Sequence, residues 1–382
     1  MLPPGDVSAW QRRHGGVGGS TVSAVEANEQ ERKDGANNGP QIEFSATRLF
    51  RQWMGETQSA FAFTTYQGGA LCVIGVKQDG FLDRSFFPFE RCMGLAHNET
   101  ALWVASRYQM WRFSNNVTRS EQEAGIGRAY RPRVAYVTGD IDIHEIDIDA
   151  GGRPIFANTA FSCLATVSDT SSFQEVWRPK FVSRLASEDR CHLNGLAMRD
   201  GKPGFVTAFS MSDTSEGWRQ LRVGGGVVID VDSHEPVATG LSLPHSPRWH
   251  KGRLYVLNSG EGSFGEIDLN TGSYQEIARL PGYARGLDFV GRFAVVGLSM
   301  ARDGVFSGLP LEDRLTQTGE AARCGIRVID LDTGDVVHGL DIQGKVQELF
   351  DVRLFPNIPR IALMGGRAGD YSKLVSAEQK AQ

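Results

Sequence analysis

One phrase recurs between residues 91 and 300: an apolar strand, a polar hinge of three to five residues, and a second apolar strand. The copies read CMGLAHNETALWVAS, HEIDIDAGGRPIFANTA, LNGLAMRDGKPGFVTAF, HSPRWHKGRLYVLNSG and YARGLDFVGRFAVVGLS. In the last four copies the apolar residue before the hinge is Ile148, Met198, Trp249 and Phe289, so successive copies lie 50, 51 and 40 residues apart. A period of roughly 40–50 residues, with several short strands per unit, predicts an all-β chain folded as a β-propeller.

The number of inner strands predicts six blades. A sixth phrase, VQELFDVRLFPNIPRIALMG, aligns Leu354 with the hinge residues of the other copies. If the strands at 61–89 pair with the C-terminal strands at 349–364, they complete the last blade and remove an open sheet edge. Seven blades is the alternative, with residues 61–89 as a blade of their own. Two long insertions, residues 114–133 and 301–323, interrupt the spacing, and such loops often cover a binding site.

The two ends of the chain differ in composition from the repeat. Residues 1–45 are rich in Gly, Ser, Asn and Glu and hold few large apolar residues, which predicts a disordered tail. The propeller is expected over residues 46–372, followed by a short tail at 373–382. Apolar residues at helical spacing within 46–58 indicate a short helix packed against the propeller.

Polar side chains occupy one equivalent position of successive inner strands, four residues before the hinge residue. Strand side chains alternate between the two faces with period two, so a residue two positions earlier shares this face. By this alternation Arg91 also falls on the pore face, whereas Glu145 and Asp351 are expected to point away from it. The predicted pore residues are His144, His192, Asn194, His245, Arg285 and Glu348.

This set of side chains has the chemistry of a metal centre. Neutral imidazoles bind transition metals, so we predict a divalent metal held by His144, His192, His245 and Asn194. An open coordination position would polarise a substrate oxygen or activate water. Arg285 and Glu348 are the candidate catalytic residues. Arg285 and Arg91 are candidates to bind a carboxylate or phosphate of the substrate. The competing interpretation is a wet channel whose polar residues hold ordered water.

Charge and cysteine content restrict the binding partners and the cellular compartment that are expected for this protein. The net charge of −5 provides no basic field that would recruit nucleic acid or an anionic membrane. The five cysteines are odd in number and form no CxxC pair, which favours reduced thiols in a cytoplasmic protein. No run of 18 apolar residues occurs, so no membrane span is expected.

Parts of the sequence resemble two groups of known propeller proteins, and these resemblances bear on the fold and on the metal ligands. The phrase HLNGLAMRDGKP is similar to the Asn-Gly-Leu-Ala strand and turn of the gluconolactonase, SMP-30 and strictosidine-synthase-like six-bladed propellers. In those lactonases the Asn is a metal ligand, which implies a ligand role for Asn194. Their other ligands are acidic, whereas His144 and His245 stand at the aligned positions, which favours iron, zinc or manganese over calcium. Over residues 61–365 the chain more closely resembles a bacterial family of functionally uncharacterised propellers. The phrases that carry this likeness are GDIDIHEIDID, AFSCLATVSD, CHLNGLAMRDG, LPHSPRWH and GYARGLDFVGRFAVVGLS.

The prediction that follows is a metal-dependent propeller enzyme acting on a small polar or anionic molecule at the central channel. Hydrolase, lyase or isomerase chemistry is favoured. One alternative is a non-haem iron oxygenase, as in the carotenoid-cleaving oxygenases, whose architecture is similar. The other is a non-catalytic propeller that serves as an interaction scaffold, which would not need three histidines aligned in its pore.

Overall fold

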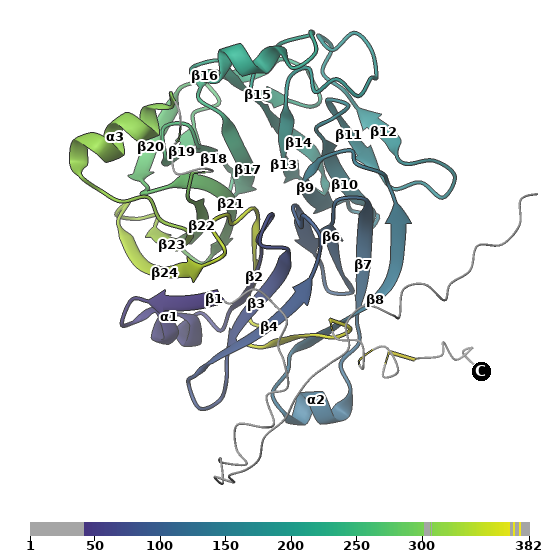
Figure 1. Cartoon of the computed structure of the whole chain (residues 1–382), viewed down its shortest axis with the longest axis vertical. Helices are drawn as coiled ribbons and strands as arrows, with labels where there is room; N and C mark the ends of the chain where they lie inside the picture. The colour runs from purple at the N-terminus through teal and green to yellow at the C-terminus, as the bar shows by residue number, and fades with distance from the viewer. Residues whose placement is uncertain (1–41, 302–305, 307, 367–369, 371–373, 376–382) are drawn as a thin grey trace, which may run out of the picture. The chain divides into compact units, whose positions relative to one another are not determined.

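Six β-sheets surround a central channel, as the prediction of a six-bladed β-propeller requires (Figure 1). The structure, a computed structural model, describes residues 42–301, 306, 308–366, 370, 374 and 375. The innermost strands of the six sheets contact one another in a closed ring. Among the described residues, no helix has the length and apolar character needed to cross a bilayer.

Within each sheet the strands run antiparallel from the channel outwards, apart from one parallel strand. The blade that closes the ring consists of β25 (Val352–Phe355), β2 (Ala60–Thr64), β3 (Ala70–Val76) and β4 (Leu82–Pro88). The next consists of β5 (Leu95–His97), β6 (Ala101–Ala105), β7 (Gln109–Asn115), β8 (Arg128–Val137) and the parallel strand β26 (Ile361–Leu363). The third consists of β9 (Ile143–Ile148), β10 (Pro154–Asn158), β11 (Cys163–Thr166) and β12 (Gln174–Trp177).

The other three blades follow in chain order. The fourth consists of β13 (Leu193–Arg199), β14 (Lys202–Ala208), β15 (Gly226–Asp230) and β16 (Pro236–Leu241). The fifth consists of β17 (Pro244–His250), β18 (Arg253–Asn258), β19 (Ser263–Ile267) and β20 (Tyr274–Arg279). The sixth consists of β21 (Tyr283–Val290), β22 (Phe293–Ser299), β23 (Gly325–Asp330), β24 (Val336–Gly344) and β1 (Ile42–Ala46). The helical segments are α1 (Phe50–Glu56), α2 (Arg119–Glu123), η3 (Gly217–Leu221) and α3 (Pro310–Thr318).

The apolar cores lie between neighbouring blades, which explains why middle strands such as β6 and β10 are buried on both faces. Leu257 and Phe264 of the fifth blade, for example, pack in one cluster with Leu287 and Val296 of the sixth. A sheet that is covered on both sides reads in sequence as a nearly continuous apolar run. The recurring apolar strands of the repeat are these middle strands.

The ring closes where the two ends of the propeller meet. Strand β2 pairs with β25 from Ala60–Phe355 to Phe63–Val352, so the strands at 61–89 complete a blade rather than forming a seventh. The C-terminal strands do not stay together, because β26 leaves this blade and joins β8. At the other end, β1 pairs with β24 inside the segment predicted as a tail. The ordered domain therefore begins by residue 42 rather than 46, and the rest of that predicted tail lies outside the described residues.

The predicted short helix is present as α1, which buries its apolar side against the propeller. Phe50, Trp53 and Met54 are buried and share a cluster with Val328 and Leu340 of the sixth blade. The helix thus covers the outer strands near the point of closure.

The innermost strands do not alternate regularly, and this overturns one expectation. The pairing register shifts by a residue within β9, β13, β17 and β21, near the predicted pore positions. Such a bulge places an extra residue on the inner strand and re-aims the side chains beside it. Glu145, which was expected to point away from the pore, is therefore buried in the channel, 3% exposed. Asp351, 2% exposed, is buried there as well, because it precedes the first residue of β25 and alternation does not apply to it.

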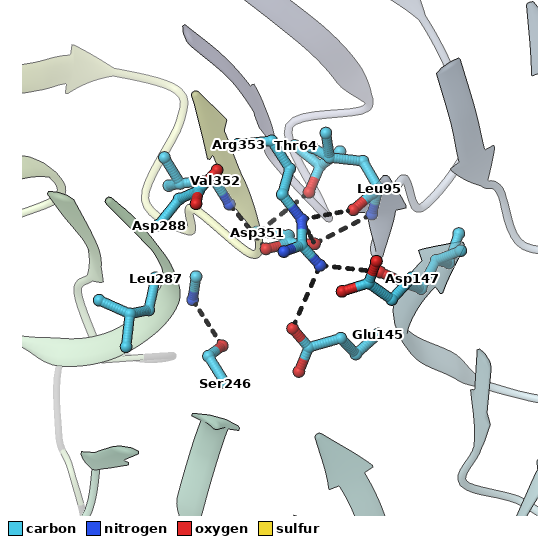
Figure 2. Close-up of polar contacts among 12 residues, drawn as sticks. Thr64, Leu95, Glu145, Asp147, Ser246, Leu287, Asp288, Asp351, Val352 and Arg353 are labelled. Atoms are coloured by element: carbon cyan, nitrogen blue, oxygen red, sulfur yellow. Dashed lines mark hydrogen bonds and ion pairs between the residues drawn. The ribbon is translucent and has the colours of Figure 1, made fainter. Parts of the chain in front are cut away.

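Two arginines and two acids form a buried ionic network in the channel. Figure 2 shows Arg353 with its guanidinium directed at Glu145, Asp351 and the Leu95 carbonyl. Arg248 forms an ion pair with Glu145, and its Nη2 lies 3.7 Å from Asp351 Oδ1. Burial raises the pKa of both acids, and the two guanidinium groups oppose this by stabilising the carboxylates.

This network, together with Asp288, supplies hydrogen bonds between blades, whose sheets share no backbone ladder. Each bond joins a side chain on or next to one inner strand to a backbone group of another inner strand. They are Arg353 Nε to Leu95 O (2.8 Å), Arg353 Nη2 to Ile146 O (2.7 Å), Leu196 N to Glu145 Oε2 (3.2 Å), Arg248 Nη1 to Leu196 O (3.3 Å), Arg248 Nε to Leu287 O (2.7 Å) and Leu354 N to Asp288 Oδ2 (2.7 Å). Together they connect all six inner strands.

Loss of one arginine from this network should destabilise the fold strongly. Arg353→Met leaves buried carboxylates short of a cation, and breaking a buried pair in this way costs about 3–5 kcal/mol of unfolding free energy. Arg253→Met is the matched control, since Arg253 also pairs with an acid, Glu266 at 2.9 Å, but is 62% exposed. Denaturant unfolding should show a large loss for Arg353→Met and little change for Arg253→Met. Equal losses would contradict the role of the network.

His97 on β5 should make stability depend on pH. Its Nε2 lies 2.6 Å from Leu354 O, and burial lowers its pKa to about 4, an effect increased by Arg128 and Arg353 and opposed by Asp147. The unfolded chain, with an ordinary histidine pKa of about 6.5, binds the proton more readily. Stability from this group is therefore complete above pH 6.5 and is lost as the pH falls toward 4.

The measurement compares wild type with His97→Phe at pH 7 and pH 5. The fall in unfolding free energy between these two values should be smaller in the variant by up to about 2 kcal/mol. An unchanged fall would show that His97 is protonated equally in both states.

Candidate functional site

A cavity of about 320 Å³ opens where the innermost strands begin. Its lining combines aromatic rings with cationic, acidic and imidazole groups. The lining residues are Tyr66, Asp142, His144, Asp189, His192, Phe209, Trp218, Arg219, Arg222, Leu243, Tyr283, Arg285 and Phe350. Of the predicted pore residues, His144, His192 and Arg285 meet in this cavity.

The ionic network and the cavity draw on adjacent residues of the chain. Glu145 of the network follows His144 in the sequence, and Asp351 follows Phe350. The same chain segments therefore supply both the cavity lining and the network.

His144 is held as a neutral imidazole with one defined tautomer. Its Nδ1 lies 3.1 Å from Asp142 O and 2.8 Å from Thr159 Oγ1, and the Thr159 hydroxyl donates to Leu193 O at 2.6 Å. Because that hydroxyl has given its only proton away, Nδ1 of His144 must be the donor. Burial lowers the pKa of His144 to about 3. The lone pair of the neutral ring is therefore on Nε2.

The same support is repeated two blades further along at His245. Nδ1 of His245 lies 2.9 Å from Leu243 O and 3.1 Å from Ser259 Oγ, and the Ser259 hydroxyl donates to Ala284 O at 2.7 Å. Burial, reinforced by the Arg285 charge, lowers the pKa of His245 well below its usual value. His245 is not among the lining residues, and it contacts Phe209 and Tyr283, which are.

His192 forms a dyad with Asp189. His192 Nδ1 lies 2.8 Å from Asp189 Oδ2, and Trp218 Nε1 donates to the same oxygen at 2.8 Å. The ring of His192 is stacked on Phe209, with centroids 4.2 Å apart, and meets the ring of His144 edge-on at 4.9 Å. An acid that orients a histidine in this way leaves the other ring nitrogen available as a proton acceptor.

Arg285 is the cation of the cavity without an ionic partner among the described residues. Its guanidinium carbon lies 5.1 Å from the Tyr283 ring centroid and 4.6 Å from that of Phe350. Its Nε is buried and makes no hydrogen bond with the described residues. Two aromatic faces fix the planar guanidinium without neutralising it, which suits recognition of an anion.

Arg91 does not line the cavity and instead forms ion pairs with two aspartates, one of which is the lining residue Asp142. Arg91 Nη2 lies 2.8 Å from Asp140 Oδ1 and 2.9 Å from Asp142 Oδ1. The pKa of the Asp142 carboxyl is held below its ordinary value: burial opposes ionisation, and His144, His192, Arg91 and Arg285 outweigh it. The placement of Arg91 thus supports a positioning role at Asp142.

Several lining residues have backbone in the left-handed region. The φ angles are 44° for Tyr66, 56° for Asp142, 43° for Asp189, 52° for His192 and 48° for Leu243. Non-glycine residues adopt this conformation only at a cost, and they concentrate at functional sites. Asp142, His192 and Leu243 stand at equivalent points of three blades, each two residues before the polar position, so the repeat itself turns these side chains toward the mouth.

The predicted metal ligands do not converge. The described residues contain no group of three or more His, Cys, Asp or Glu side chains placed to hold one metal ion. Asn194 is fully used inside the protein, because its Nδ2 donates to His192 O at 3.1 Å and its Oδ1 accepts from Thr207 Oγ1 at 2.8 Å. The set of His144, His192, His245 and Asn194 does not fit a shared ion, since bulges and local acceptors direct each side chain separately.

Glu348 also lies apart from the predicted site. It is buried, 6% exposed, in the connection between β24 and β25, and does not line the cavity. The lining residues that the sequence analysis missed are Tyr66, Asp142, Asp189, Phe209, Trp218, Arg219, Arg222, Leu243 and Tyr283. Asp142 and Tyr283 could have been found, since each stands two residues before a predicted pore residue. Trp218, Arg219 and Arg222 lie in or just after η3, outside the repeat, where no register applies.

The second predicted insertion does reach the cavity. Leu309, which precedes α3, packs in one apolar cluster with Phe209, Trp218 and Leu243, and Phe306 contacts Tyr283. The first insertion, which holds α2, lies beside β8 instead, where Glu121 pairs with Arg131 at 2.6 Å.

Comparison with known proteins identifies the family. The family described as a domain of unknown function, DUF4915, matches residues 48–364, and the chain belongs to it. No curated protein matches the chain. The likeness to lactonase-type propellers therefore stays a prediction.

Of the solved structures compared, the one with a TM-score of 0.50 supports the fold alone. A chain from a nidogen/laminin complex is 12% identical, with 78% of this chain and 98% of that chain covered and a TM-score of 0.50. A protein of unknown function from Bacteroides caccae is 12% identical over 78% and 98% of the two chains, with a TM-score of 0.49. A catalytically inactive virginiamycin B lyase from Staphylococcus aureus, with quinupristin, is 10% identical over 79% and 99%, with a TM-score of 0.38.

Proposed function

We propose that this member of the DUF4915 family is an enzyme that binds a small anionic molecule at the channel mouth and moves a proton on it, as lyases, isomerases and hydrolases do. One observation carries the proposal: an arginine without an ionic partner among the described residues and an Asp-supported histidine line the same cavity. Arg285 would hold the anion, and His192 would take the proton.

The roles follow from the contacts of each side chain. Arg285 offers a planar, cationic fork to a carboxylate or phosphate. His192 accepts a proton at Nε2 while Asp189 stabilises the imidazolium that results. Removing a proton from the carbon next to a carboxylate builds negative charge on that carboxylate, which the guanidinium would stabilise. A non-catalytic scaffold has no use for this combination inside a cavity.

Binding of an anion should depend on Arg285. We expect a simple aromatic carboxylate, phenylacetate, to bind wild type and to lose most of its affinity in Arg285→Lys, because lysine cannot reproduce the planar fork. Arg292→Lys is the matched control, since Arg292 also stacks on a ring, Phe293 at 5.2 Å, but is paired and 59% exposed. Calorimetric titration measures affinity, and thermal unfolding should show little change. Equal affinity in wild type and Arg285→Ala would end the proposal.

Proton transfer should depend on His192 and Asp189. Each carboxylate that binds is incubated with the protein in D₂O, and deuterium entry at the carbon next to the carboxylate is followed by NMR. His192→Gln should slow exchange by about 100-fold or more while binding is kept, because a general base contributes roughly 10²–10⁴ in rate. Asp189→Asn should slow exchange as well. Exchange that continues unchanged in His192→Gln would assign the base to another residue.

A further inference from the structure

We infer that the molecule bound at this site carries a hydroxyl or N–H donor in addition to its anionic group, and that His144 Nε2 accepts that hydrogen bond. The inference rests on the proposed function and deepens it by naming a substrate class, the hydroxylated or amino-substituted carboxylates. It assigns His144 a specificity role distinct from the role of His192 as base.

The hydrogen-bond partners of His144 determine its tautomer. Every group within reach of Nδ1 is an acceptor: Asp142 O at 3.1 Å, Thr159 Oγ1 at 2.8 Å with its proton committed to Leu193, and Asp142 Oδ2 at 3.6 Å. The proton of the neutral ring must therefore be on Nδ1, and Nε2 can only accept.

The other ring nitrogen of His144, Nε2, has no hydrogen-bond partner in the described part of the chain. His144 lines the cavity and is 7% exposed. A ligand that displaces solvent from this acceptor must replace the lost hydrogen bond, and a ligand group that donates to Nε2 does so. A ligand lacking the donor would leave the acceptor unpaired.

The ring of His144 contacts two other lining residues. Its ring meets His192 edge-on at 4.9 Å and Phe350 at 5.3 Å, and Phe350 also stacks on Arg285 at 4.6 Å. One aromatic ring thus contacts both the acceptor and the cation. A small molecule whose anion binds Arg285 therefore lies close enough to His144 to present a donor to it.

His245 has the same hydrogen-bond support as His144 but a different surrounding. The two histidines have the same support, a backbone carbonyl two residues earlier and a hydroxyl committed to the next inner strand. Nε2 of His245 is buried without a partner among the described residues, yet His245 does not line the cavity. Of these two histidines, His144 therefore lies where a ligand in the cavity can reach it, and His245 serves as the control.

The experiment uses two acids that differ by one hydroxyl, phenylacetate and mandelate, the latter tested as both enantiomers. The tighter mandelate enantiomer should bind wild type about tenfold more strongly than phenylacetate, the effect of one satisfied hydrogen bond. In His144→Leu this ratio should fall to about one, because leucine neither accepts a hydrogen bond from the hydroxyl nor loses one when the hydroxyl is absent. In His245→Leu the ratio should stay near its wild-type value.

The outcomes separate the two proposals. Failure of both acids to bind wild type would overturn the proposed function and the inference together. Equal binding of the two acids by wild type, or a preference that survives in His144→Leu, would overturn the inference and leave anion binding by Arg285 in place.

A second measurement keeps the test decisive if His144→Leu does not fold. The ¹⁵N chemical shifts of the wild-type imidazoles distinguish protonated from unprotonated nitrogen. We expect an unprotonated Nε2 at His144 near pH 7, with a shift that mandelate changes markedly and phenylacetate changes little. A protonated Nε2, or equal responses to both acids, would refute the assignment.

Discussion

The buried network of Arg248, Arg353, Glu145 and Asp351 is the interaction on which the rest of the molecule depends. A propeller has no backbone ladder between its blades, so apolar packing alone would leave the inner strands free to slide relative to one another. The arginines bond to backbone carbonyls of neighbouring strands and to the two carboxylates at once. Such a network is stabilising only when every member is present, because a missing partner leaves a buried charge uncompensated.

The same segments that carry the network also carry the site. His144 and Glu145 are adjacent, yet one lines the cavity and the other joins the ionic network. A regular strand would send adjacent side chains to opposite faces, and the bulge in β9 lets both be used inside the channel. Left-handed backbone at Asp142 and His192 then turns further side chains toward the mouth. The strain of these conformations is sustained by a rigid ring of blades.

The sequence was sufficient to predict the six blades and the closure by β2 and β25, because a repeat of buried strands leaves a periodic apolar pattern. It was also sufficient to bring His144, His192 and Arg285 into one site, since equivalent positions of inner strands converge. It failed where one residue alters the register, as at Glu145, and where a side chain finds a local partner, as Asn194 does with Thr207. Asp189 and Trp218 come from loops outside the repeat, so no periodicity could have placed them.

In the proposed function, anion binding and proton transfer are assigned to different groups of the cavity. Burial, with help from Arg285, lowers the pKa values of His144 and His245, so these rings stay neutral acceptors beside a permanent cation. His192 alone has a carboxylate bonded to its Nδ1, which stabilises a proton arriving at its other nitrogen. In the proposed function, anion recognition therefore belongs to Arg285, and proton transfer belongs to the one histidine of the three whose Nδ1 forms a hydrogen bond with a carboxylate.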